Sequence, residues 1–152
     1  MQRRDFLKGC MVFTAASMFL PNFVSPLMAD DEEFAKLYAS ITQGKTVVAG
    51  DGKIKLVMEE KPANAMKAQV EITVDYPMTS SDYISKIYVL APKNKFSHAI
   101  TASYTPKSGM AYLYTEMRVG FPQDVVILAE TNKGQIFKIT KNIKVEASGC
   151  GG

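Results

Sequence analysis

The sequence predicts a mainly β domain that is preceded by one helix and followed by a flexible C-terminal arm. Apolar and polar residues alternate over short stretches, most regularly in residues 70–76. Pro, Gly and Asn residues separate about eight such stretches, and no helical pattern lies between them. This combination is typical of an antiparallel β-sandwich of the immunoglobulin-like kind.

Residues 30–45 predict the helix. The acidic residues 30–33 suit the positive N-terminal end of a helix dipole. Apolar side chains recur at the i, i+3, i+4 and i+7 spacing of one helix face, and Gly44 is the expected end. The residues of that apolar face are Phe34, Leu37, Tyr38 and Ile41.

The predicted strands are short apolar or alternating stretches that lie between turn residues. They cover residues 54–58, 70–76, 85–90, 99–104, 111–119, 125–131, 135–140 and 143–146. Asn132-Lys133-Gly134 predicts the turn of a hairpin, and residues 59–64 predict a surface loop.

Two strands carry apolar side chains on a face that a lone monomer would be expected to leave exposed. Val126 and Leu128 lie on the opposite face of their strand from their odd-numbered neighbours, and Tyr112 and Tyr114 point outward beside charged residues. The four side chains predict a contact surface for another protein. A central strand buried on both faces and ordinary cross-strand aromatic pairing would give the same pattern.

The N-terminus predicts an export signal. Arg3 and Arg4 precede Phe-Leu-Lys and a weakly apolar run over residues 11–20, which resembles a twin-arginine signal peptide. A membrane-spanning helix needs about 20 apolar residues, and this run is shorter. Cleavage after Ala29 would remove residues 1–29, Cys10 among them, and leave a domain over residues 30–146 and an arm over residues 147–152.

The charge balance excludes two classes of partner. The chain holds 18 Lys and Arg and 15 Asp and Glu. Because residues 1–29 contain three of the basic residues and one of the acidic ones, the predicted mature chain has a net charge of only +1. Neither a basic stripe for nucleic acid nor a polybasic membrane patch is present in the sequence.

The sequence offers a single reactive group. His98 is the only histidine, and it has no second His or Cys nearby with which to form a zinc site or a Cys/His dyad. Cys150 would be the only cysteine of the mature chain, so no internal disulfide is expected. We expect no catalytic site, metal or cofactor in the domain itself.

Cys150 lies among glycines at the end of the chain. Gly149, Gly151 and Gly152 have no Cβ and are free to adopt both halves of φ space. Residues 146–150 fully extended span about 17 Å. This arrangement predicts a thiol that is carried into the active sites of other proteins.

Together these features resemble the SoxY family, the sulfur-compound carrier subunits of the periplasmic Sox thiosulfate-oxidation system. The resemblance covers the export signal, the helix, the β domain and the terminal Gly-Gly-Cys-Gly-Gly motif, in which Ser148 here replaces the first glycine. It implies that Cys150 holds thiosulfate-derived groups covalently. An exported immunoglobulin-like structural or interaction module with an incidental terminal cysteine is the alternative.

The resemblance also implies the partners. They are a SoxZ-like β-domain subunit that forms a heterodimer with the carrier, a c-type cytochrome that joins thiosulfate to the thiol, a hydrolase that releases sulfate, and an enzyme that oxidises the remaining sulfane sulfur. A resident cofactor and membrane insertion are not implied.

The export signal gives the first testable prediction. Changing Arg3 and Arg4 together to Lys keeps the charge but removes the pair that the export receptor recognises, so the precursor should accumulate in the cytoplasm. Cell fractionation with detection of the precursor and processed forms measures this. Normal delivery of the double Lys variant to the periplasm would show that the assignment is wrong.

Overall fold

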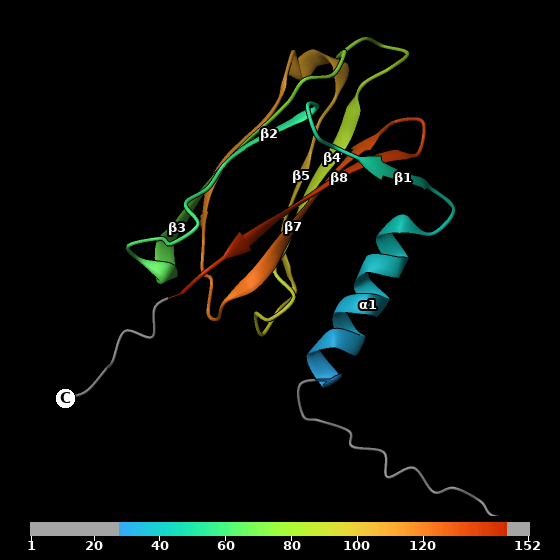
Figure 1. Ribbon diagram of the computed structural model, residues 1–152. Helices are drawn as coiled ribbons and strands as arrows, with labels where there is room; N and C mark the ends of the chain where they lie inside the picture. Colours follow the sequence, from blue (N-terminus) through green and yellow to red (C-terminus); the bar gives the residue numbers. More distant parts are fainter. Residues whose placement is uncertain (1–27, 146–152) are drawn as a thin grey trace, which may run out of the picture.

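One helix and two β-sheets form the part of the chain that the computed structural model describes, residues 28–145 (Figure 1). Helix α1 (Met28–Thr42) comes first. The five-stranded sheet has the order β1 (Thr46–Ala49), β8 (Gln135–Ile143), β7 (Gln123–Thr131), β4 (Ile84–Leu90), β5 (His98–Ser103). The three-stranded sheet has the order β2 (Ile54–Val57), β3 (Ala68–Val74), β6 (Ala111–Met117). Two short 3₁₀ helices, η1 (Ala65–Lys67) and η2 (Pro106–Ser108), lie in the connections.

The predicted fold class, a mainly β sandwich with an N-terminal helix, is confirmed. Two details differ from the prediction. Residues 135–140 and 143–146 were expected as separate strands, but β8 runs without a break to Ile143. Strand β1 was not predicted, because it is a four-residue edge strand without alternating burial, and it pairs with β8 in parallel rather than antiparallel orientation.

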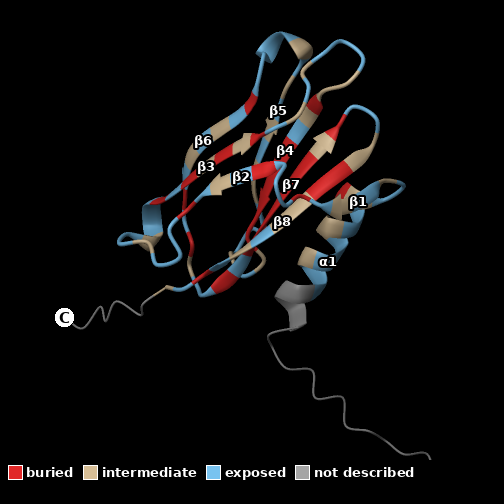
Figure 2. Cartoon of the chain, turned by 45° about the horizontal axis from the view of Figure 1, so that its top comes forward, coloured by how far each residue is buried: buried red, intermediate tan, exposed pale blue. Residues whose placement is uncertain are grey.

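The main core fills the space between the two sheets. In β3 the side chains of Val70, Ile72 and Val74 are buried, while those of the residues between them are more exposed (Figure 2). From the opposite sheet, Val125 and Ile127 of β7 are fully buried in the same cluster. The alternation that predicted these strands therefore marks the inner face of each sheet.

A second, smaller core lies on the outer face of the five-stranded sheet, under helix α1. There Val126 and Leu128 are 6% and 0% exposed. The prediction that they form a partner surface is wrong, because the helix of the same chain covers them and makes β7 a central strand buried on both faces. The residues of this cluster are Phe34, Leu37, Tyr38 and Ile41 of α1 with Tyr88, Leu90, Val126, Leu128 and Ile136 of the sheet.

Polar contacts fix the helix over the sheet at its C-terminal end. The Lys45 ammonium lies 2.9 Å from Glu130, and the same carboxylate accepts a hydrogen bond of 3.0 Å from the Tyr88 hydroxyl. Burial, followed by that hydrogen bond, raises the pKa of Tyr88 to about 12. The Lys138 ammonium lies 5.0 Å from the centre of the Tyr38 ring, within cation–π range.

The predicted hairpin turn is confirmed between β7 and β8. Gly134 has φ of +81°, which favours glycine, and its amide donates to the Thr131 carbonyl at 3.2 Å.

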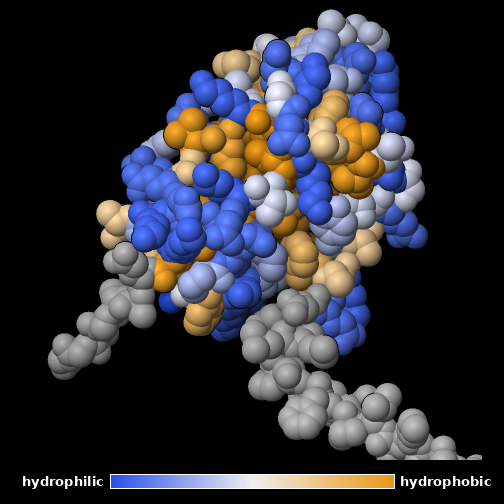
Figure 3. Space-filling model, viewed as in Figure 1, coloured by the Kyte–Doolittle hydropathy of each residue, from blue (hydrophilic) through white to orange (hydrophobic). Residues whose placement is uncertain are grey.

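On the face seen in Figure 3, apolar patches over β1 and β2 are separated by hydrophilic side chains.

The buried position of Leu128 yields a stability prediction. Leu128→Ala should lower the free energy of unfolding of the isolated chain by about 2–5 kcal/mol, since it leaves a cavity under the helix. Tyr114→Ala, on the exposed face of β6, is the control and should cost much less. Urea denaturation of the purified single chain measures both values. A Leu128→Ala protein as stable as the Tyr114→Ala protein would contradict the packing of α1 on this sheet.

Candidate functional site

The residues predicted to carry the chemistry lie outside the described residues. These are Cys150 with Gly149, Gly151 and Gly152 of the arm, and Arg3 and Arg4 of the export signal. The structure instead defines where the last segment of the chain begins and what surrounds that point.

The chain is anchored firmly at the end of β8. Ile143 is fully buried and pairs with Gln123 of β7, and Val145 packs against the main core. Between them, the Lys144 amide donates to the Glu60 carbonyl at 2.7 Å, and the Lys144 ammonium forms an ion pair with the Glu60 carboxylate. The Lys144 hydrogen bond, with the lysine charge, holds the pKa of Glu60 below its usual value. The chain is therefore held in place as far as Val145, two residues before the predicted arm.

We call the anchored residues 143–145 the root of the arm. Two loops lie next to this root, residues 91–97 and residues 118–122. They are joined by Gln123, which is only 3% exposed. Its side-chain amide donates to Asn94 Oδ1 at 3.0 Å and its carbonyl accepts from the Lys93 amide at 2.9 Å.

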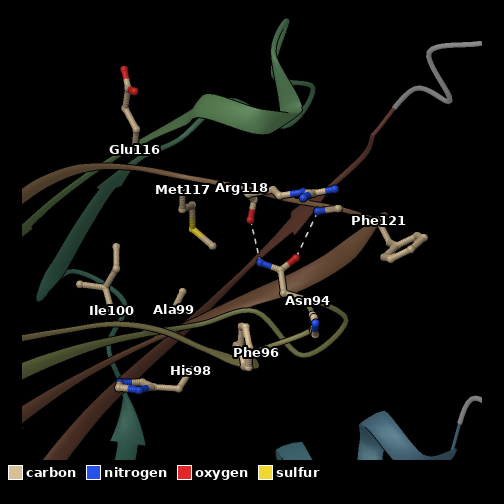
Figure 4. A pocket seen from close by; sticks show the side chains of 11 residues that line it. Asn94, Phe96, His98, Ala99, Ile100, Glu116, Met117, Arg118 and Phe121 are labelled. Atoms are coloured by element: carbon tan, nitrogen blue, oxygen red, sulfur yellow. Dashed lines mark hydrogen bonds between the residues drawn. The ribbon is translucent and has the colours of Figure 1, made fainter. Parts of the chain in front are cut away.

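Asn94 completes the connection between the two loops. Its side-chain amide donates to the Arg118 carbonyl at 2.7 Å and its oxygen accepts from the Gly120 amide at 3.1 Å (Figure 4). The two loops at the root of the arm are thus held together by a partly buried polar network.

A pocket of about 530 Å³ lies beside these loops, between the edge strands β5 and β6. Phe96, Ile100 and Met117 contribute apolar walls, and Glu116 and Arg118 bring charges to its rim (Figure 4). Lys95 is a further charged residue of the lining. The other lining residues are Asn94, His98, Ala99, Gly120 and Phe121. Sequence reasoning missed this site. The signal that could have found it is a phenylalanine placed among Lys, Asn, Gly and Pro residues in each loop.

His98 is an exposed residue at the start of β5. Its ring nitrogen lies 2.5 Å from the Thr101 hydroxyl on the same strand. Within residues 28–145, no group of three or more His, Cys, Asp or Glu side chains is arranged to hold a metal ion. No helix among the described residues is long and apolar enough to cross a membrane.

Tyr112 and Tyr114 do point outward, from the outer face of the three-stranded sheet. They are 42% and 51% exposed. The Tyr112 hydroxyl donates to Glu71 of β3 at 3.4 Å, and Tyr114 lies opposite Glu71 in the β3–β6 register. Their use as a partner surface stays a prediction.

Comparisons with known proteins agree with this fold. A solved sulfur carrier protein SoxY from Chlorobium limicola f thiosulfatophilum superposes with a TM-score of 0.62 at 14% identity, covering 76% of this chain and 98% of that one. A superoxide reductase (neelaredoxin) from Ignicoccus hospitalis gives 0.55 at 16% identity, covering 70% and 86%. At such identities these likenesses show a shared fold. A search of curated proteins found no match.

The family comparison is more specific than the structural likenesses. The model of the family described as sulfur oxidation protein SoxY matches residues 38–150. That range takes in the last turn of α1, both sheets, the anchored root and the chain as far as Cys150. The chain therefore belongs to the SoxY family of sulfur oxidation proteins.

Proposed function

We propose that this protein is a periplasmic sulfur carrier that holds thiosulfate-derived intermediates on Cys150 and presents them to the enzymes of thiosulfate oxidation. The observation that carries the proposal is the family match, which extends to Cys150 itself. A solved member of the family is described as a sulfur carrier protein, which supports the same role here. The paired Arg3 and Arg4 support delivery by the twin-arginine route.

Loading of the carrier is an oxidation. The Cys150 thiol and thiosulfate form a sulfur–sulfur bond, giving a cysteine S-thiosulfonate. One proton and two electrons leave, and a c-type cytochrome partner accepts the electrons. A hydrolase partner then adds water to the terminal sulfone group and releases sulfate and two protons, which leaves one sulfane sulfur on Cys150. A further partner oxidises or transfers that sulfur, and the thiol returns.

In this scheme the domain positions the Cys150 thiol, and the partners catalyse the reactions. The carrier thiol is activated inside each partner, so the domain needs no base or metal of its own. The anchored residues 143–145 give the arm a fixed origin, and the glycines on both sides of Cys150 are proposed to let the thiol enter narrow sites.

Family membership implies a partner within the Sox system, and we propose a SoxZ-like β-domain subunit. Helix α1 already covers the outer face of the five-stranded sheet. The outer face of the three-stranded sheet lacks such a cover among the described residues and carries Tyr112 and Tyr114, together with Val57, which is 53% exposed. Aromatic side chains such as these tyrosines are enriched in protein interfaces.

Removing the two tyrosines tests this interface. The double variant Tyr112→Ala and Tyr114→Ala should weaken pairing with the SoxZ-like subunit by at least about tenfold, as loss of aromatic anchor residues does. Titration of one subunit against the other measures the dissociation constant. An unchanged constant would place the subunit interface elsewhere.

Cys150→Ala should abolish thiosulfate-dependent reduction of the cytochrome while leaving the fold and subunit pairing unchanged. The reason is that the thiol is the only cysteine sulfur of the mature chain. Ser148→Gly, which restores the glycine of the family motif, is the matched control and should keep turnover. Visible absorbance of the cytochrome follows the reaction, and turnover by Cys150→Ala would refute the carrier function.

A further inference from the structure

Two phenylalanines are strongly exposed at the end of the sandwich where the arm begins. Phe96 is 71% exposed and Phe121 is 62% exposed, the highest values among the large apolar side chains of the described residues. They come from different loops, beside the same pocket between β5 and β6. Exposed aromatic side chains that gather at one place mark protein interaction sites.

We propose that Phe96, Phe121 and this pocket form the docking surface for the enzymes that receive the arm, and that the surface recognises an acidic protein surface with an apolar patch. The proposal rests on the carrier function proposed above. Three independent features of the described residues support it.

The first feature is that the loops are held in place before any partner binds. Asn94 and the buried Gln123 join residues 91–97 to residues 118–122 through the hydrogen bonds described above. The Val119 amide also donates to the Ala65 carbonyl of η1 at 2.7 Å. A preorganised surface loses little conformational freedom on binding, and that favours affinity. This framework therefore presents the two phenyl rings as ready-made contacts.

The second feature is charge. Lys93, Lys95 and Arg118 are exposed on the two loops, whereas Glu116 is the acidic residue on the pocket rim. The Lys95 ammonium lies 5.7 Å from the centre of the Phe96 ring, so positive charge and apolar surface meet at one point. An acidic partner is complementary to such a surface, and the attraction accelerates encounter at low salt.

The third feature is reach. Ile143 at the end of β8 pairs with Gln123, and Gln123 bonds Asn94 at the pocket, so the root of the arm lies beside the docking surface. Cys150 extends at most about 17 Å beyond that root. The nine residues of β8 span about 30 Å, so the opposite end of the sandwich, near η2, lies beyond the reach of Cys150. A partner that encloses Cys150 must therefore place its own surface against this end.

The test compares a double variant, Phe96→Ser with Phe121→Ser, with a matched control. The control, Met110→Ser, removes a 53% exposed apolar side chain at the opposite end. The probe is the purified c-type cytochrome that loads thiosulfate, paired with full-length carrier in its subunit complex. Loading of Cys150 is followed by intact-mass analysis at a series of carrier concentrations.

We expect the double Phe variant to raise the half-saturating carrier concentration at least about tenfold, with the loss in half-saturation rather than in maximal rate. Met110→Ser should behave like the wild type. The charge variant Lys95→Glu with Arg118→Glu should show a similar loss and should no longer respond to added salt as the wild type does.

Unchanged half-saturation in the double Phe variant would overturn the docking proposal, while normal loading of the wild type would leave the carrier function standing. If Cys150 of the double Phe variant reacted with a small thiol reagent at a different rate from Cys150 of the wild type, the pocket would hold the chain's own arm. That result would also overturn the proposal. The proposal would also be overturned if the double Phe variant no longer paired with its subunit. The same holds if sedimentation showed that the wild type self-associates and the variant does not. A wild-type carrier that gains no adduct would refute the carrier function, and the docking proposal with it.

Discussion

The burial of β7 on both faces is the constraint on which the rest of the structure depends. Val125 and Ile127 face the three-stranded sheet, and Val126 and Leu128 face helix α1. Because the strand is apolar on both sides, neither cover can be removed without exposing a large hydrophobic area to water. The domain is thereby closed on both sides of its larger sheet, and functional contacts fall to the loops, the open edges and the smaller sheet.

Those remaining surfaces divide the proposed work between two regions. The tyrosines of β6 lie on the outer face of the smaller sheet, which suits a permanent subunit. The two loops that carry Phe96 and Phe121 lie at the end of the sandwich where β8 ends. That position suits enzymes that bind the carrier only briefly. A carrier needs both properties at once, a rigid body that partners recognise and a thiol that can leave it. Lys144 and Glu60 hold the chain to the domain shortly before the proposed arm.

The sequence was informative wherever one pattern admitted one physical explanation. Alternation in residues 70–76 and the helical spacing from Phe34 to Ile41 predicted β3 and the packed face of α1 correctly. Val126 and Leu128 were misassigned because a local pattern shows that a face is apolar but not whether the chain's own helix or a partner covers it. The polar network of Asn94 and Gln123 could not be predicted, since it joins two loops that only the sheet register brings together.

The covalent attachment of sulfur to Cys150 is the central claim, and intact-mass analysis of the C-terminal peptide tests it most directly. The protein would be purified from cells grown with and without thiosulfate, and reduced and unreduced samples compared. We predict that thiosulfate adds a thiosulfonate or sulfane-sulfur mass to the peptide containing Cys150, and that reduction removes it. An unmodified peptide under both conditions, in cells that are oxidising thiosulfate, would contradict the carrier function.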